Sequence, residues 1–191
     1  MSYKTDSFDR TVIELLNSGA IGLLPSDTIY GLSSRALDKT AVDRLHEVKH
    51  RDKTKPFVVL ISKIEQLNDL GIITTDAAPA LRYWPGKLTM VLPAAKVPAW
   101  LHMGTKTLAV RQPGYPELMD LIDKTGPIIS TSANISGGQP AASVKQAREY
   151  FGDKLDFYVD VGPLRGQPST IAKVDNFKIK ILRQGAIIIN T

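Results

Sequence analysis

The chain has 191 residues, of which 43% are hydrophobic and 23% charged, and its 24 Lys and Arg against 19 Asp and Glu give a formal charge of +5. This length and composition are typical of a folded globular protein and exclude disordered and collagen-like chains. We expect a single domain over residues 1–191. The lack of cysteine excludes a disulfide scaffold, a thiolate zinc site and a cysteine nucleophile, and the three histidines lack metal-ligand spacing, so no metal site within the protein is expected.

The N-terminal half predicts helices and strands in alternation. Apolar residues at helical spacing indicate a helix over 8–16, which Asp6 or Ser7 can cap and which ends before Gly19. The apolar run 21–24 indicates a buried strand that delivers the polar segment 25–34 as a loop. A second helix opens at Thr40 and ends in the basic loop 49–55, and the β-branched run 57–62 indicates a central strand.

Further along, the order of elements stays irregular. Because helices and strands do not alternate as strict βαβ units, we expect an α/β fold with a twisted mixed sheet and flanking helices. The predicted helices are 64–70, 77–83, 117–124 and 144–151, and the predicted strands are 88–92, 107–111, 127–130, 157–161, 169–174, 178–183 and 186–189.

The positive charge is concentrated in one loop. Residues 49–55 hold four cations against one carboxylate and so supply +3 of the +5. An excess of this kind favours anionic partners such as nucleotides or RNA. No run approaches the ~20 apolar residues of a membrane-spanning helix, and the first ten residues lack the apolar core of a secretory signal. We therefore expect a cytoplasmic protein with no membrane contact.

Five polar or basic segments follow predicted strands or helices, where α/β proteins commonly place ligand loops. Each alone is typical of an ordinary turn, a solvated loop or a surface ion pair. Together, lysine, several arginines and many hydroxyls suit a ligand that carries phosphates. No GxxxxGK[ST], GxGxxG or GxSxG motif is present. The segments are Ser26–Thr28, Lys49 with Arg51, Arg111, Ser130–Asn134, and Ser169–Thr170 with Arg183.

Three of these segments carry a specific resemblance. PSDTIYGLSS, VKHRDKTKPFVVLI and STSANISG resemble, in order and spacing, the P-T-[ED]-T-x-Y-G-L, K-x-R and S-x-N motifs of the YrdC family, the threonylcarbamoyl-AMP synthases of the TsaC type. LAVRQPGYP, PSTI and ILRQGAI follow in the same order, so the resemblance runs from about Gly19 to Ile187. The chain resembles the short, single-domain form. Two departures are Ser26 in place of the first Thr, and Leu60 where many relatives have histidine.

The resemblance implies a YrdC-like fold, a twisted mixed sheet around a large, positively charged cleft. It implies an enzyme that joins L-threonine, bicarbonate and ATP, with Mg2+, into threonylcarbamoyl-adenylate and pyrophosphate. Proteins of the TsaD, TsaB and TsaE type would then place the threonylcarbamoyl group on tRNA, at the adenosine beside the anticodon. Direct binding of RNA by the chain itself is left open.

Site residues follow from the matching motifs. The resemblance implies catalytic roles for Lys49 and Arg51 on the phosphates, and for Ser132 and Asn134 near threonine and nucleotide. It also implies that Lys49→Ala or Arg51→Ala abolishes synthesis while the fold stays intact. The remaining expected contacts are Thr28, Arg111 and Ser169 on threonine, and Lys55, Ser143 and Arg183 on the nucleotide.

Two alternatives use the same residues. A non-catalytic RNA-binding or ribosome-maturation module would use the basic cleft with a salt-dependent affinity that ATP and threonine do not change. A carbamoyltransferase acting on carbamoyl phosphate would share the fold, but the chain has no accompanying zinc-finger or acylphosphatase segment.

Overall fold

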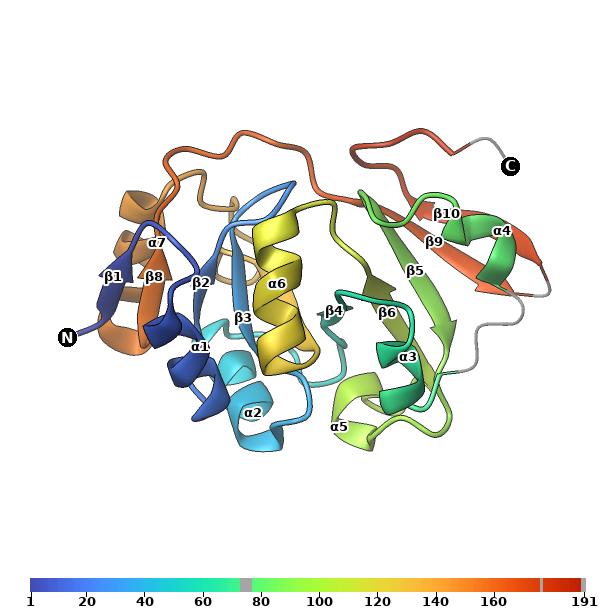
Figure 1. Ribbon diagram of the computed structural model, residues 1–191, viewed down its shortest axis with the longest axis horizontal. Helices are drawn as coiled ribbons and strands as arrows, with labels where there is room; N and C mark the ends of the chain where they lie inside the picture. The colour runs from blue at the N-terminus through green and yellow to red at the C-terminus, as the bar shows by residue number, and fades with distance from the viewer. Residues whose placement is uncertain (73–76, 176, 190–191) are drawn as a thin grey trace.

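The computed structural model of the chain describes residues 1–72, 77–175 and 177–189 (Figure 1). Within them, ten strands form one sheet in the order β1-β8-β2-β3-β7-β4-β6-β5-β9-β10. Strands β1–β8, β2–β8, β4–β6 and β5–β9 pair in parallel and the other neighbours pair antiparallel, which confirms the expected mixed sheet.

The strands are β1 (Tyr3–Thr5), β2 (Gly22–Leu24), β3 (Gly31–Arg35), β4 (Val58–Leu60), β5 (Leu88–Pro93), β6 (Thr107–Arg111), β7 (Ile128–Ser132), β8 (Phe157–Val159), β9 (Thr170–Asp175) and β10 (Lys178–Arg183). The helices are α1 (Arg10–Asn17), α2 (Lys39–Val48), α3 (Gln66–Asp69), α4 (Ala78–Leu81), α5 (Ala99–His102), α6 (Pro116–Thr125), α7 (Val144–Phe151) and the 3-10 turn η2 (Gly152–Lys154). No helix in the described ranges has the length and apolarity needed to cross a membrane.

Buried side chains lie on both faces of the sheet. Successive strand residues point to opposite faces, and along β4 Val59 belongs to the larger core cluster whereas Leu60 belongs to the smaller one. The smaller cluster is covered by α1 and α6, which pack against each other (Figure 1). The larger cluster includes residues of α2 and α7. Helices therefore flank the sheet on both sides.

Several sequence predictions need correction. The α1 helix is capped by Asp9, whose carboxylate accepts from the Val12 N–H at 3.0 Å, and not by Asp6 or Ser7. The segment 25–34, expected as a loop, includes the first four residues of β3, which pairs with β2 and β7. Residues 186–189 do not form the predicted strand. The strand β1 and the helix α5 were not predicted.

One connection positions residues at the centre of the sheet. After β8, residues 160–169 run without regular secondary structure along the top of the molecule and enter β9, which pairs with β5 (Figure 1). This segment passes close to the loop between β2 and β3, because a Cβ added at Gly166 would lie 2.0 Å from the Thr28 carbonyl oxygen. Glycine is therefore required there, and three residues further on Ser169 lines the same cleft as Ser26 and Thr28.

Candidate active site

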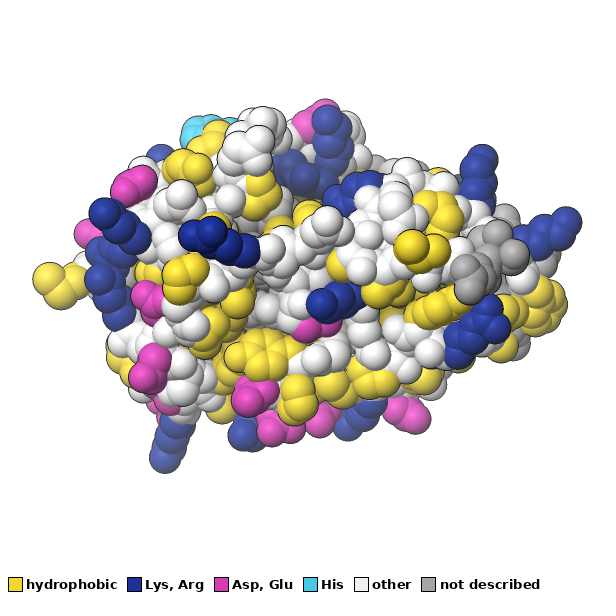
Figure 2. Space-filling model, turned by 90° about the horizontal axis from the view of Figure 1, so that it is seen from above, with side chains coloured by type: hydrophobic (Ala, Val, Ile, Leu, Met, Phe, Trp, Pro, Cys, Tyr) yellow, Lys and Arg dark blue, Asp and Glu magenta, His cyan; other side chains and the backbone are white. Residues whose placement is uncertain are grey.

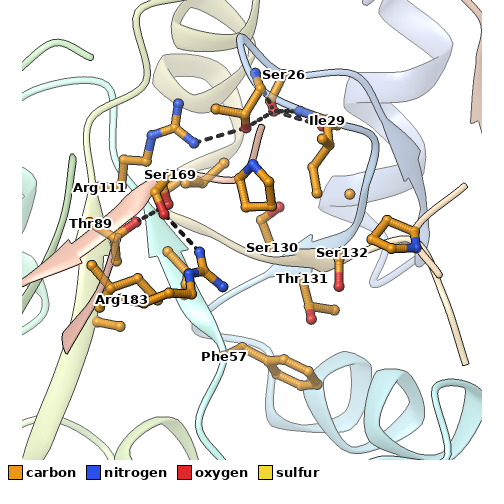
Figure 3. Close-up of a pocket in the computed structure, with 18 of the residues that line it drawn as sticks. Ser26, Ile29, Phe57, Thr89, Arg111, Ser130, Thr131, Ser132, Ser169 and Arg183 are labelled. Atoms are coloured by element: carbon orange, nitrogen blue, oxygen red, sulfur yellow. Dashed lines mark hydrogen bonds between the residues drawn. The ribbon is translucent and has the colours of Figure 1, made fainter. Parts of the chain in front are cut away.

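A cleft of about 440 Å³ lies over one face of the central strands (Figure 3). Leu60 lines the cleft and belongs to the smaller core cluster. The cleft therefore lies on the face of the sheet that α1 and α6 cover next to it. Residues two apart on a strand point to the same face, and five strands or strand ends contribute such pairs. They are Val58 and Leu60, Thr89 and Val91, Ala109 and Arg111, Ser130 and Ser132, and Ser169 and Ile171.

The cleft combines hydroxyl groups with cations. Aliphatic side chains from β4, β5, β6 and β9 are joined by serine and threonine hydroxyls and by Arg51, Arg111 and Arg183. Among the described residues that line it there is no Asp or Glu. A cleft with guanidinium groups and hydroxyls and without carboxylates suits an anionic ligand, because arginine binds carboxylate or phosphate through paired hydrogen bonds.

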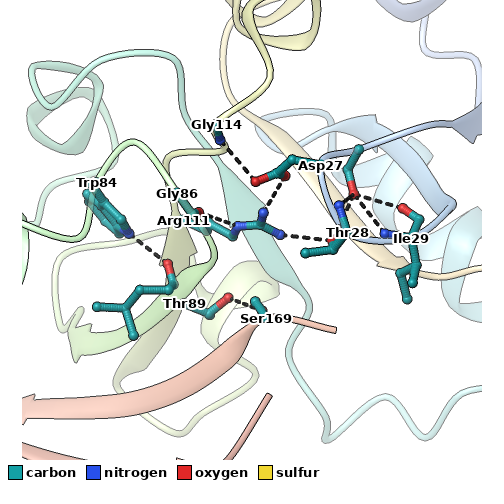
Figure 4. A network of polar contacts seen from close by, with 11 residues as sticks. Asp27, Thr28, Ile29, Trp84, Gly86, Thr89, Arg111, Gly114 and Ser169 are labelled. Carbon is teal, nitrogen blue, oxygen red and sulfur yellow. Dashed lines mark hydrogen bonds and ion pairs between the residues drawn. The ribbon is translucent and has the colours of Figure 1, made fainter. Parts of the chain in front are cut away.

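Arg111 is the centre of a buried polar network at one end of the cleft (Figure 4). Its Nε donates to the Gly86 carbonyl at 2.8 Å, its Nη1 donates to Thr28 Oγ1 at 3.2 Å, and its Nη2 forms an ion pair with Asp27. The second oxygen of Asp27 accepts from the Gly114 N–H at 3.1 Å. Burial lowers the pKa of Arg111, and the charge of Asp27 opposes that shift. The network ties three loops together around one guanidinium.

Arg183 lies on the same wall, beyond Ser169 (Figure 3). Its Nη2 donates to the Ser169 carbonyl at 2.8 Å, and the Ser169 hydroxyl is 2.7 Å from the Thr89 hydroxyl. Burial lowers the pKa of Arg183. The residue comes from β10, two strands away from β5, and the β9–β10 pairing brings it to the cleft.

Arg51 stands at the cleft beside Phe57. Its Nε and Nη2 donate to the carbonyls of Lys55 and Pro56, both at 3.0 Å, and its guanidinium lies 5.2 Å from the centre of the Phe57 ring. The ring of the buried His46 packs against Phe57, with their centres 4.1 Å apart. The loop thus fixes its arginine through its own backbone and one aromatic ring. Lys55 contributes a carbonyl, whereas its side chain is exposed and does not line the cleft.

Lys49 points into the protein, only 2% exposed. Its ammonium donates to the Ser132 carbonyl, to the Asn134 carbonyl at 3.0 Å and to Asn134 Oδ1 at 3.1 Å, which uses all three of its protons. Asn134 Oδ1 also accepts from the Ser132 hydroxyl, and its Nδ2 donates to the carbonyls of Ile135 and Gly138. Lys49 and Asn134 therefore shape the loop after β7, and Ser132 and Asn134 line the cleft.

The structure brings seven of the predicted residues to one cleft: Thr28, Arg51, Arg111, Ser132, Asn134, Ser169 and Arg183. It does not bring Lys49, Lys55 or Ser143 to the lining. Sequence reasoning gave no role to Asp27, although Asp27 is the one carboxylate in PSDTIYGLSS, and it missed Phe57. The signal for Asp27 was a charged residue among hydroxyls directly after a buried strand.

Ser143 has a structural role that the sequence also signals. Its hydroxyl accepts from the Gln146 N–H at 3.3 Å and caps α7, a position that favours serine. We expect Ser143→Ala to lower the free energy of unfolding by about 1 kcal/mol and to leave the affinity for ATP unchanged. Chemical denaturation and nucleotide titration check this, with the exposed Ser136→Ala as control. A loss of ATP affinity in Ser143→Ala but not in Ser136→Ala would support the predicted nucleotide role of Ser143.

Comparison with known proteins identifies the family. The model of the Sua5/YciO/YrdC family, described as "Telomere recombination", matches residues 14–185. The chain belongs to the Sua5/YciO/YrdC family. This membership agrees with the resemblance that the three motifs carry.

Family members of similar sequence include two curated proteins named threonylcarbamoyl-AMP synthase. The protein of Pseudoalteromonas translucida is 35% identical over 175 residues, which are 87% of this chain and 93% of that protein. The protein of Pyrococcus abyssi is 35% identical over 183 residues, which are 93% of this chain and 54% of that protein. The chain thus spans about half the length of the Pyrococcus relative and nearly all of the Pseudoalteromonas relative.

Solved structures of the family share the fold. The crystal structure of P. abyssi Sua5 complexed with L-threonine superposes with a TM-score of 0.87 at 33% identity and covers 97% of this chain and 57% of that one. The structure of E. coli YciO has a TM-score of 0.82 at 23% identity and covers 97% of this chain and 96% of that one, a likeness in fold alone.

Proposed function

We propose that this chain is a threonylcarbamoyl-AMP synthase, which makes threonylcarbamoyl-adenylate and pyrophosphate from L-threonine, bicarbonate and ATP. Two relatives that bear this name, each 35% identical, support the proposal. The observation that carries it is the cleft itself: three arginines and a row of hydroxyls, with no carboxylate among its described lining residues, on the fold of a relative solved with L-threonine.

Each end of the cleft has a proposed role. Thr28, Arg111 and Ser169 hold threonine, with Arg111 on its carboxylate, because this end offers hydroxyls and a guanidinium with unused N–H groups. Arg51 and Arg183 bind the phosphates of ATP. Lys49 and Asn134 are positioning residues, since their polar atoms hold the loop after β7 in place beside the cleft.

The chemical step needs positioning and charge stabilisation. The threonine amine and bicarbonate form an N-carboxylate with loss of water, and an oxygen of this carboxylate attacks the α-phosphorus of ATP. The bond from the α-phosphorus to the bridging oxygen breaks, and pyrophosphate leaves with the electron pair. Holding the two anions in line lowers the entropic part of the barrier, and guanidinium groups stabilise the charge that develops on the leaving group.

Magnesium enters this scheme as part of the substrate, MgATP. No group of three His, Cys, Asp or Glu residues in the described ranges is placed to hold a metal ion. Mg2+ commonly binds through substrate phosphates with few protein ligands. The donor set therefore fits an ion that arrives on the nucleotide, and bound in that way it would neutralise phosphate charge.

The product requires an acceptor. A mixed anhydride of a carbamate and AMP is reactive toward amines, so we propose that a transferase of the TsaD, TsaB and TsaE type consumes it at the adenosine of tRNA, in the cytoplasm. Direct binding of tRNA by this chain is not needed for synthesis.

Pyrophosphate release from the purified chain tests the proposal. We expect release that requires ATP, Mg2+, L-threonine and bicarbonate together, with threonylcarbamoyl-adenylate detected by mass spectrometry. Omitting each component in turn is the control. A chain that binds ATP without releasing pyrophosphate would contradict the proposal. RNA affinity that depends on salt but not on ATP or threonine would then favour the non-catalytic RNA-binding alternative.

A further inference from the structure

The three arginines of the cleft differ in how their charge is compensated. Arg111 forms a buried ion pair with Asp27. Arg51 and Arg183 bond instead to backbone carbonyl oxygens, and neither makes an ion pair with any residue that the structure describes. A carbonyl dipole orients a guanidinium but leaves its net charge in place. The cleft therefore has one arginine neutralised by a buried ion pair and two without an ion pair, of which Arg51 feels the charge of the exposed Asp52 only at longer range.

Asp27 is placed to compensate Arg111 without meeting the ligand. Its side chain is 10% exposed and does not line the cleft, and its two oxygens are occupied by Arg111 and by the Gly114 N–H. Arginine has five N–H donors, and three of those on Arg111 are engaged by protein atoms. Two donors remain, the number that one carboxylate accepts. The Asp27–Arg111 pair can therefore donate directed hydrogen bonds to a ligand while carrying almost no net charge.

The neighbouring arginine makes this compensation significant. Arg111 and Arg183 stand on the same wall of the cleft, with Ser169 and Thr89 between them (Figure 3). Without Asp27 this wall would present two charged guanidiniums in sequence. A chain of phosphates could then bind in more than one register along it, because charge attracts phosphate at any position with little directional preference.

We propose that Asp27 is a specificity-determining residue. By cancelling the charge of Arg111, it reserves this end of the cleft for the zwitterionic head of an amino acid, and phosphates bind only at Arg51 and Arg183. The inference rests on the proposed function and deepens it. Asp27 would discriminate against phosphate at the threonine end by removing the attraction that an uncompensated Arg111 would exert on it. Asp27 contacts no substrate and acts through Arg111.

The first test uses the unmodified chain and inorganic pyrophosphate as the probe. Calorimetric titration is expected to show that pyrophosphate displaces ATP, while the affinity for L-threonine stays within about twofold. Pyrophosphate that displaces threonine as effectively as it displaces ATP would overturn the inference. A chain that binds ATP and pyrophosphate but no threonine would instead overturn the proposed function.

The second test changes the charge. We expect Asp27→Asn to make threonine binding sensitive to pyrophosphate, with about a tenfold loss of threonine affinity at saturating pyrophosphate, and to leave the KM for ATP nearly unchanged. Asp156→Asn is the matched control, because it removes the carboxylate of the Arg44–Asp156 ion pair outside the cleft. Folded Asp27→Asn in which threonine binding ignores pyrophosphate would contradict the inference.

A conservative variant separates charge from packing. Asp27→Glu keeps the negative charge beside Arg111, so we expect it to exclude pyrophosphate from the threonine end even if the longer side chain weakens threonine binding. If Asp27 served packing alone, both variants would bind threonine more weakly. Pyrophosphate would then not compete with threonine in Asp27→Asn while sparing Asp27→Glu. Should Asp27→Asn fail to fold, the titration of the unmodified chain still tests the inference, because displacement of threonine by pyrophosphate there would overturn it.

Discussion

Replacing Arg51 with alanine is expected to lower threonylcarbamoyl-AMP synthesis by about a hundredfold or more, the usual cost of removing one group that stabilises transition-state charge. The guanidinium lies at the cleft, retains its charge and is held by two backbone carbonyls and the Phe57 ring. These contacts are made at a partly exposed position, so their loss costs only about 1 kcal/mol of stability. Pyrophosphate release under saturating substrates, with thermal unfolding alongside, measures both effects.

Two further variants sharpen the Arg51 result. Arg10→Ala removes an arginine of comparable size whose side chain is 90% exposed on α1, and it should leave synthesis unchanged. Arg51→Lys keeps the charge but not the planar fork, so we expect only partial recovery. Equal activity of Arg51→Ala and the unmodified chain would remove Arg51 from the proposed site. An unfolded Arg51→Ala would instead show that the loop needs its arginine for stability.

Much of the fold could be predicted from hydrophobic periodicity. Helices α2, α6 and α7 and strands β5, β6 and β10 formed close to their predicted ranges because apolar residues recur in each at helical or strand spacing. The strand β3 was missed because its sequence, GLSSR, contains one apolar residue among glycine and serines. Pairing with β2 on one side and β7 on the other buries it, and this tertiary contact overrides its weak strand propensity.

The sequence predicted which residues lie near the cleft, but not in which direction each side chain points. Motif spacing selected seven residues that the structure places around one cleft, because polar side chains after strands gather at the same region of the sheet. Whether a motif side chain faces the ligand or the protein depends on packing. Lys49 shows that a signal existed: with Val42 and Leu45 it follows the i, i+3, i+7 spacing of the buried face of α2. That spacing indicates a buried lysine.

The orientation of Lys49 changes what its removal is expected to do. Sequence reasoning expected Lys49→Ala to abolish synthesis in an intact fold. Because the ammonium binds the carbonyl at the end of β7 and two oxygen atoms of Asn134 in the loop that follows, we expect Lys49→Met to lower the free energy of unfolding by about 2–4 kcal/mol, since two carbonyls lose their donor. Synthesis falls as well, because the loop that lines the cleft loses its support. Urea denaturation measures the change, with the exposed Lys53→Met as control.

The pH dependence of the free energy of unfolding reports on the buried ammonium of Lys49. Burial, with the nearby charge of Arg51, lowers the pKa of Lys49 from 10.5 to about 8. Between these values the unfolded chain retains a proton that the folded chain has released, so raising the pH favours the folded state. The stability of the unmodified chain relative to Lys49→Met should therefore rise between pH 8 and 10.5 and stay constant below this range. A fall over the same interval would mean that the three oxygens stabilise the charged ammonium more than burial destabilises it.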